Sequence, residues 1–274
     1  MQIKTIKKVI TQKLEEWLAT ISDEKLRKDV KKNILVSGGC ITSMLQGQPV
    51  NDYDIYLMDM DVLVKLARYY KPGSVLDGRQ KDAYIKDRFP RYEPAHPYLN
   101  DHSDYYDDSD EYDPNRELYT PAMLVRLLSL KPDQVKLDIE SQGIRIDPAD
   151  INPALTYQPA FFSQNAISLT NDIQIVLRFN GSPEKIHSTF DFIHATNYFT
   201  FKEGLVMNLE AVQSILTRTL SYQGSFYPLT SIIRMKKFIS RGWTINAGEI
   251  LKIMFQISEL NLNDIVILEE QLIG

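Results

Sequence analysis

Cysteine and histidine are scarce in this chain, whose 274 residues include one Cys and four His. A single Cys cannot form an internal disulfide, which excludes a secreted scaffold held together by disulfides. The histidines are His96, His102, His187 and His194. They are too scattered to supply the closely spaced Cys and His ligands of a structural zinc site, so that class is excluded as well.

Long apolar runs are also missing. No window reaches the roughly 18 to 20 apolar residues that a transmembrane helix requires. The N-terminal residues are charged early and lack the apolar core of a signal peptide. We therefore expect a cytoplasmic protein without a membrane partner.

Acidic residues slightly outnumber basic ones, giving a net charge of -5, but the two signs are unevenly distributed. Residues 100–113 contain seven acids and no Lys or Arg, and without those acids the net charge is +2. The seven are Asp101, Asp104, Asp107, Asp108, Asp110, Glu111 and Asp113. Residues 1–32 carry nine Lys and Arg against five acids, and residues 201–242 carry six against two. This distribution is compatible with a polyanionic partner such as RNA.

Apolar periodicity divides the chain into a mixed N-terminal part and a helical C-terminal part. Helical spacing is found at residues 3–18, 24–30, 61–70, 205–220, 228–241 and 247–260. Strand-like runs cover residues 33–36, 53–57, 135–139, 166–169 and 173–179. Residues 71–121 are rich in Pro, Tyr and Asp with little periodicity, which predicts an irregular acidic insertion.

The most informative stretch joins a short apolar run to Gly38 and Gly39, then to a short helix, and then to Asp52-Tyr53-Asp54 on a second strand. Glycines allow a backbone to approach phosphate oxygens closely, and a helix N-terminus attracts anions. Asp52 and Asp54 are two residues apart on an extended chain, so both carboxylates project from one face. Two such carboxylates favour a divalent cation, and Mg²⁺ completes its shell with substrate phosphates.

These residues resemble the polymerase-β-like nucleotidyltransferase superfamily, which combines a Gly-Gly turn, a short helix and Asp-x-Asp. The spacing over residues 38–55 is similar to that of CCA-adding enzymes and bacterial poly(A) polymerases. The chain departs from them at Thr42-Ser43, where Arg-Asp is usual, and has no later Glu-Asp-x-x-Arg motif. Phe190-Asp191-Phe192 and residues 231–242 are similar to uncharacterised nucleotidyltransferase-like proteins of bacteriophages.

The resemblance implies an α+β fold with a mixed, mostly antiparallel sheet flanked by helices and followed by a helical lobe. The catalytic domain would cover residues 1–204, with the insertion at about 71–121, and the lobe residues 205–274. The implied reaction uses two Mg²⁺ or Mn²⁺ ions to move a nucleoside monophosphate from a triphosphate to a hydroxyl.

The superfamily uses a third carboxylate on a neighbouring strand. We expect Asp191, because it lies between two Phe residues on a presumed strand, an unfavourable place for an acid without a partner. Asp138 is the second candidate. The predicted metal ligands and catalytic residues are thus Asp52, Asp54 and Asp191.

The predicted nucleotide-binding residues surround the Gly-Gly turn and include cations from elsewhere in the chain. They are Gly38, Gly39, Ser43, Arg178 and Lys236. The acceptor hydroxyl belongs to an RNA 3′ end, a protein side chain or a small molecule, and the sequence leaves this choice, the base preference and the oligomeric state open. The alternative function is a catalytically silent relative that binds a nucleotide or a partner.

Overall fold

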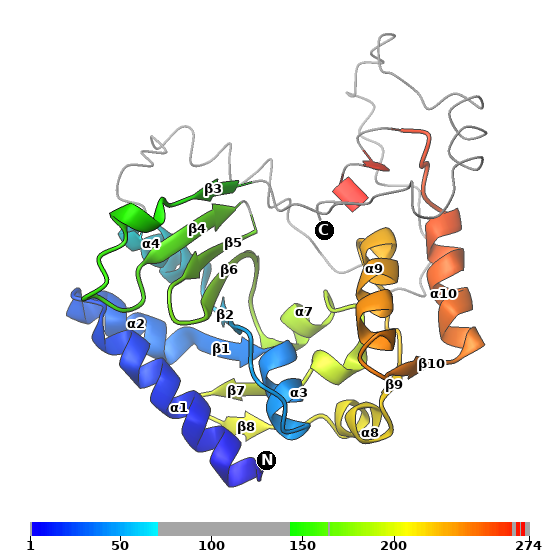
Figure 1. Ribbon diagram of the computed structural model, residues 1–274, viewed down its shortest axis with the longest axis horizontal. Coiled ribbons are helices and arrows are strands. Elements are labelled where there is room, and N and C mark those ends of the chain that lie inside the picture. The colour runs from blue at the N-terminus through cyan, green and yellow to red at the C-terminus, as the bar shows by residue number, and fades with distance from the viewer. Residues whose placement is uncertain (1, 71–142, 164, 265–266, 269, 272–274) are drawn as a thin grey trace.

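The computed structural model describes residues 2–70, 143–163, 165–264, 267–268 and 270–271. The helices are α1 (Ile3–Ala19), α2 (Glu24–Asn33), α3 (Gly39–Leu45), α4 (Met60–Tyr70), α7 (Pro183–His187), α8 (Leu209–Thr217), α9 (Pro228–Ile239) and α10 (Ala247–Ser258). Short 3₁₀ turns lie at η2 (Pro148–Asp150) and η3 (Ile193–Ala195). Figure 1 shows a sheet with helices against it and a helical lobe to one side.

The sheet has eight strands in the order β3-β4-β5-β6-β2-β1-β7-β8. The strands are β1 (Ile34–Ser37), β2 (Tyr53–Leu57), β3 (Gly143–Arg145), β4 (Pro159–Ser163), β5 (Ala166–Leu169), β6 (Ile173–Asn180), β7 (Tyr198–Thr200) and β8 (Gly204–Val206). β2 and β6 pair in parallel, whereas the other neighbours in this sheet pair antiparallel. The predicted α+β class with a mixed, mostly antiparallel sheet is confirmed.

The two faces of the sheet have different environments. Along β2, the side chains of Tyr53, Ile55 and Leu57 are buried in the main core, together with side chains of α1, α2 and α4. Because side chains alternate on a strand, Asp54 and Tyr56 point to the opposite face. There Tyr56 joins a second apolar cluster near α7. Helices α1, α2 and α4 therefore cover one face, and the carboxylate of Asp54 lies on the other.

A glycine turn connects the centre of the sheet to α3. Gly38 has φ +90° and ψ -147°, a backbone conformation that is strongly unfavourable for any residue with a Cβ atom. Its N–H donates to the carbonyl oxygen of Ala195 at 3.0 Å, which fixes the turn. An ideal Cβ on Gly38 would lie 3.0 Å from Oδ2 of Asp54. Glycine is thus needed here both for its backbone conformation and for its lack of a side chain.

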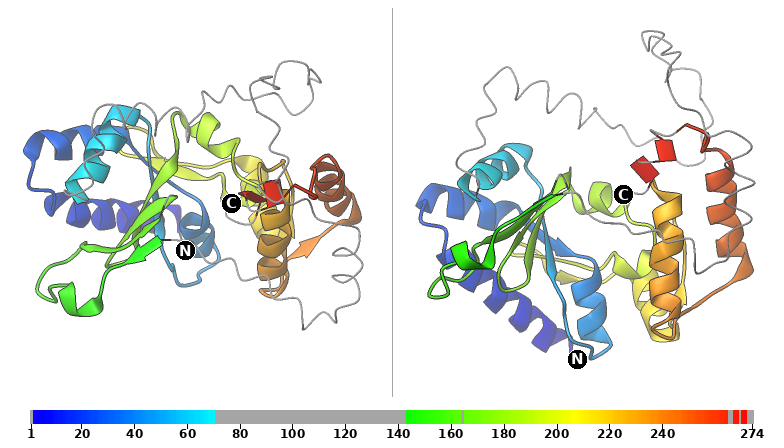
Figure 2. Two further views of the ribbon diagram at one scale, coloured as in Figure 1. Left: turned by 90° about the horizontal axis from the view of Figure 1, so that it is seen from above. Right: turned by 45° about the horizontal axis from the view of Figure 1, so that its top comes forward.

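The helical lobe has its own small core. Phe192, Ile215, Leu220, Trp243 and Ile253 are among its buried residues. A short parallel pair, β9 (Thr219–Leu220) with β10 (Thr244–Ile245), joins the ends of α8 and α9. Figure 2 shows α9 and α10 side by side, next to the sheet-containing part.

Most predicted elements agree with the structure, but strands β3 and β4 were not expected. The N-cap of α2 is Asp23, whose side chain accepts from the N–H of Leu26. The last strand of the large sheet, β8, ends at Val206. Asp191 does not lie on a strand of the sheet, which corrects that expectation. The predicted insertion and Asp138 lie outside the described residues.

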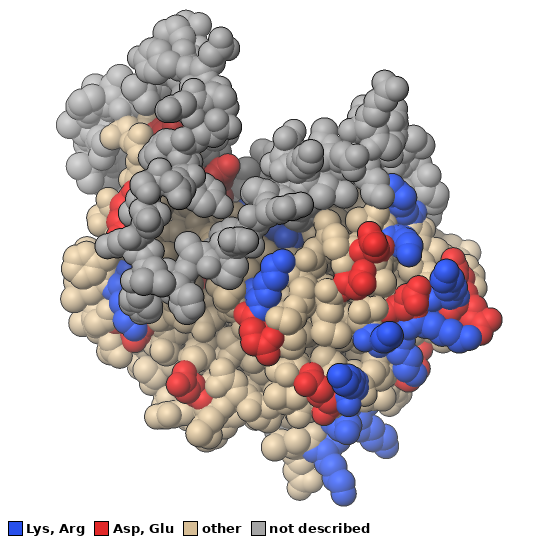
Figure 3. All heavy atoms as spheres, turned by 180° about the vertical axis from the view of Figure 1, so that it is seen from behind, with Lys and Arg blue, Asp and Glu red and all other residues tan. Residues whose placement is uncertain are grey.

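The basic residues of the first two helices are interleaved with acids. Nζ of Lys31 lies 2.5 Å from Oε1 of Glu15, and Nζ of Lys28 lies 2.6 Å from Oε1 of Glu24. Figure 3 shows both signs intermingled on one face of the molecule. The positive charge of this region is therefore partly compensated at the surface. Among the helices that the structure describes, none has the length and apolar character needed to cross a bilayer.

The strained conformation of Gly38 leads to a prediction about stability, for which the neighbouring Gly39 serves as the control. We expect Gly38→Ala to lower the free energy of unfolding by about 1–3 kcal/mol, because the backbone is strained and the new methyl group would meet Asp54. Gly39→Ala should change it by less than about 0.5 kcal/mol, since no atom lies within 4 Å of its ideal Cβ. Urea denaturation of both variants tests this, and equal losses would contradict the role assigned to Gly38.

Candidate functional site

The carboxylate pair is at the start of β2, in the centre of the sheet. Asp52 is exposed and Asp54 is partly buried. Asp54 is paired with Ser37 of β1 on one side and with Gln174 of β6 on the other. The main chain therefore holds Asp54 in a fixed register, immediately beside the Gly38 turn.

Asp54 is held in an unfavourable environment for a negative charge. Burial and, to a smaller extent, the nearby charge of Asp52 raise the pKa of its carboxyl group to about 7, although Arg234 acts in the opposite direction. A divalent cation placed between the two carboxylates would remove their repulsion. Two carboxylates are of the ligand type that Mg²⁺ prefers, so Asp52 and Asp54 are the residues that could hold it.

A cavity of about 300 Å³ lies between the Gly-Gly turn and the helical lobe. We call it the glycine-side cavity. One wall consists of Asp52, Asp54 and residues of α3 and its loop, including Gly39 and Ser43. The opposite wall comes from the lobe and carries the three cations Arg234, Lys237 and Arg241. Carboxylates that can hold Mg²⁺ thus face cations that can bind phosphate, which is the charge arrangement that a metal–nucleotide complex requires.

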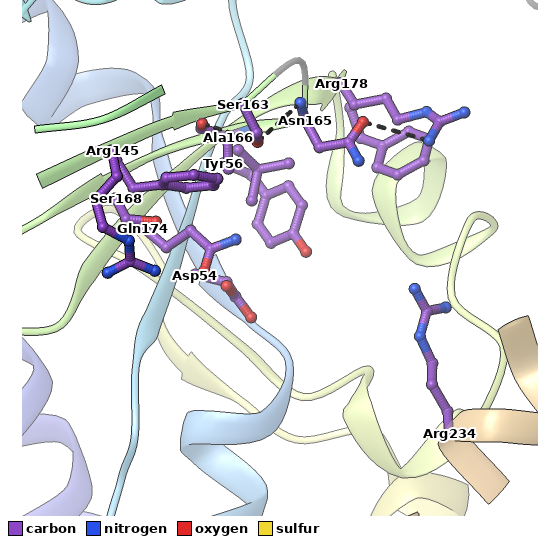
Figure 4. Close-up of a pocket in the computed structure, with 13 residues that line it drawn as sticks. Asp54, Tyr56, Arg145, Ser163, Asn165, Ala166, Ser168, Gln174, Arg178 and Arg234 are labelled. Atoms are coloured by element: carbon purple, nitrogen blue, oxygen red, sulfur yellow. Dashed lines mark hydrogen bonds between the residues drawn. The ribbon is translucent and has the colours of Figure 1, made fainter. Parts of the chain in front are cut away.

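A second cavity of about 830 Å³ lies over the open face of the sheet. We call it the sheet-side cavity. Figure 4 shows Arg145, Gln174 and Arg178 on the sheet side and Arg234 opposite them. Asp54 and Arg234 also line the glycine-side cavity, so both cavities meet at these two residues.

The structure places Asp191 in a different role from the predicted third metal ligand. Its side chain is 3% exposed, and Oδ2 accepts a hydrogen bond from Nη1 of Arg234 at 2.6 Å. Oδ1 accepts from the hydroxyl of Ser225 at 2.8 Å. No group of three His, Cys, Asp or Glu side chains within the described parts of the chain is arranged to hold a metal. Because Asp191 is engaged by Arg234 and Ser225, it does not form a three-carboxylate site with Asp52 and Asp54.

The other predicted nucleotide-binding residues are divided between the two cavities. Gly39 and Ser43 line the glycine-side cavity, whereas the N–H of Gly38 is used by Ala195. Arg178 lies in the sheet-side cavity, where its guanidinium donates to the hydroxyl of Tyr227 and to Oδ1 of Asn165. Lys236 is exposed and is not among the lining residues of either cavity.

The helix from Arg234 to Lys237 was expected to supply cations, with Lys236 chosen among them, whereas Arg234, Lys237 and Arg241 line the glycine-side cavity. Arg234 and Lys237 are three residues apart on α9, which places them on one helix face, and Arg241 follows the end of that helix. Gln46 and His194, which also line this cavity, were not among the predicted site residues.

Comparison with known proteins gives a family and two more distant similarities. Residues 8–218 match the family model described as "Gabija anti-defense 2 family protein". The curated protein "Gabija anti-defense 2" of Bacillus phage SPbetaL7 is 26% identical over 102 residues, which cover 36% of this chain and 26% of the phage protein. The chain thus spans about a quarter of that relative.

Among solved structures, the Thermotoga maritima CCA-adding enzyme complexed with tRNA is similar at 13% identity and a TM-score of 0.41. The alignment covers 91% of this chain and 46% of the enzyme.

The raised pKa of Asp54 predicts how stability changes with pH in metal-free buffer. The folded state keeps a proton on Asp54 that the unfolded state releases near pH 4, so this residue makes folding less favourable as pH rises towards 7. The slope is at most about 1.4 kcal/mol per pH unit. Asp54→Asn should therefore be more stable than the wild type at pH 8 and lose this advantage near pH 4. Urea denaturation across this range, in EDTA, measures the difference, and parallel pH profiles would contradict it.

The ion pair between Asp191 and Arg234 predicts a coupled loss of stability. Arg234→Met leaves a buried carboxylate without its cation and should cost about 3 kcal/mol, whereas Asp191→Asn should cost less. The double variant should lose at least about 1 kcal/mol less than the sum of the single losses. A double-mutant cycle by urea denaturation measures the coupling, and simple additivity would show that the pair does not act as a unit.

Proposed function

The chain belongs to the Gabija anti-defense 2 family, and we propose that it is a Mg²⁺-dependent nucleotidyltransferase. It moves a nucleoside monophosphate from a nucleoside triphosphate to an acceptor hydroxyl, and an RNA 3′ end is the first acceptor to consider. We further propose that this transfer serves the anti-defense role for which the family and the phage relative are named.

The position of Asp54 between two cavities carries this proposal. A transferase must bring a donor and an acceptor to one point, and here two cavities open onto the same carboxylate and the same arginine. The glycine-side cavity has the charges for a triphosphate. The larger sheet-side cavity, with Arg145 and Arg178, suits an acceptor that carries phosphate.

The reaction follows from this arrangement. The acceptor oxygen attacks the α-phosphorus, a new P–O bond forms, and the bond to the bridging oxygen breaks so that pyrophosphate leaves. Asp52 and Asp54 would hold Mg²⁺, which neutralises charge on the phosphates and lowers the pKa of the acceptor hydroxyl. A carboxylate has two oxygens, so Asp54 can contact the cation with one and accept the hydroxyl proton with the other. Arg234 and Lys237 are placed to balance the charge of the leaving group.

A second function, nucleotide binding without transfer, is favoured by a specific observation. The place next to Asp54 on the neighbouring strand is taken by Gln174, an amide, and Asp191 is engaged elsewhere. The described residues therefore offer two carboxylates for a metal instead of three. A protein of this kind would sequester a nucleotide or present it to a partner.

Radiolabelled nucleotides separate the two functions. Each α-labelled nucleoside triphosphate is incubated with the protein, Mg²⁺ or Mn²⁺ and total RNA, and label is followed into RNA, protein or a small molecule. We expect transfer with at least one nucleotide, and a loss of about 100-fold or more in Asp52→Asn and in Asp54→Asn. The control is Asp61→Asn, which makes the same change on the exposed part of α4.

Each outcome assigns a function. Transfer that depends on Asp52 and Asp54 supports the enzyme. Tight nucleotide binding without transfer to any acceptor supports the binding module. If the protein neither binds nor transfers any nucleotide, both proposed functions are excluded.

A further inference from the structure

Two buried polar atoms without a hydrogen-bond partner belong to side chains that line the glycine-side cavity. They are Nε2 of Gln46 and Nδ1 of His194, and the parts of the chain that the structure describes supply a partner to neither. An unsatisfied buried polar group costs roughly 1–3 kcal/mol. Two such groups beside one small cavity indicate that a ligand supplies the missing partners.

The imidazole of His194 is held rigidly. The residue is 2% exposed, and its carbonyl oxygen accepts from the hydroxyl of Thr42 at 3.0 Å. Its ring centroid lies 4.5 Å from that of Phe238 and 4.7 Å from that of Trp243. Burial lowers the pKa of His194 to about 4, so the ring is neutral at physiological pH and offers one donor and one acceptor.

Gln46 is also fixed through its backbone. It is the C-cap of α3, and its N–H donates to the carbonyl oxygen of Thr42 at 3.1 Å. The preceding residue, Leu45, packs against the core of the helical lobe. The backbone at Gln46 is therefore fixed, and its buried side-chain Nε2 is a donor without a partner among the described residues.

The lining of the cavity combines charged groups with aromatic rings. Two carboxylates and three cations suit Mg²⁺ and phosphates. His194 packs against Phe238 and Trp243, and the cluster containing Trp243 also contacts Leu45, the residue before Gln46. A nucleotide likewise combines a charged tail with a flat, hydrogen-bonding base.

We propose that Gln46 and His194 read the nucleobase of the bound nucleotide and thereby set which triphosphate the protein prefers. This inference rests on the proposed nucleotide site. The base lies against the ring wall of Phe238 and Trp243, an acceptor on its edge receives the N–H of Gln46, and His194 contacts a second position on that edge. A flat base satisfies both orphan atoms together, and an amide with a neutral imidazole discriminates bases by their pattern of donors and acceptors.

Isothermal titration calorimetry of the four nucleoside triphosphates in Mg²⁺ tests the inference on the full chain. The wild type should prefer one nucleotide by about tenfold or more, which corresponds to one hydrogen bond. Gln46→Met keeps the shape and removes the donor, so it should weaken the preferred nucleotide about tenfold and leave the others within about twofold. Gln46→Glu replaces the donor by an acceptor and should weaken the preferred nucleotide further. Gln12→Met, on the exposed side of α1, is the matched control.

His194→Phe provides a second, independent variant. It keeps the aromatic packing with Phe238 and Trp243 and removes both ring nitrogens, and a melting curve confirms that it folds. Reduced discrimination among the four nucleotides is expected.

The results distinguish a failure of base reading by Gln46 and His194 from a failure of the proposed nucleotide site. If the wild type binds a nucleotide but the Gln46 variants change all four affinities equally, or change none, base reading by Gln46 is overturned and the nucleotide site stands. A Gln46→Met protein that melts at a higher temperature with unchanged affinities shows that the donor is buried without a partner and without a role in binding, and also overturns the inference. If the wild type binds no nucleotide, both proposals fail.

Discussion

The buried carboxylate of Asp191 fixes the position of the helical lobe relative to the sheet-containing part of the molecule. It lies between α7 and η3, and it receives one hydrogen bond from Ser225 and one from Arg234 of α9. Charged groups are rarely buried unless they are paired, so the carboxylate and the guanidinium fix each other's position. Ser225 also accepts the N–H of Tyr227, the N-cap of α9. The start of this helix is therefore tied to the sheet-containing part by a network of hydrogen bonds.

This constraint determines the chemistry of the site. α9 contributes the cations that face Asp52 and Asp54, so the distance between the two kinds of charge depends on where the helix is anchored. A cation–π contact also joins these two parts, because the guanidinium of Arg178 lies 4.3 Å from the ring centroid of Tyr227. Carboxylates on a central strand are thus matched by cations on a helix that is distant in sequence.

The sequence predicted local units well because their signals are local. The strand, Gly-Gly turn, helix and Asp-x-Asp strand were found at the right residues, since glycine tolerance and side-chain alternation depend on neighbours in the chain. Asp191 was misplaced because Phe190-Asp191-Phe192 alternates like a strand. In the structure, Phe190 packs with the cluster at Tyr56, whereas Phe192 belongs to the core of the lobe. The alternation reflects two cores, which only the tertiary structure reveals. Lys237 lines the glycine-side cavity and Lys236 does not, since adjacent lysines on a helix point in different directions.

Arg234 lines both cavities and also forms the ion pair with Asp191. A ligand on either side that attracts this guanidinium changes what it offers to the other side. If each cavity holds such a ligand, occupancy of one alters the affinity of the other, and thermodynamic linkage requires the effect to be equal in both directions. One shared arginine side chain would then couple the two compartments without any movement of the sheet.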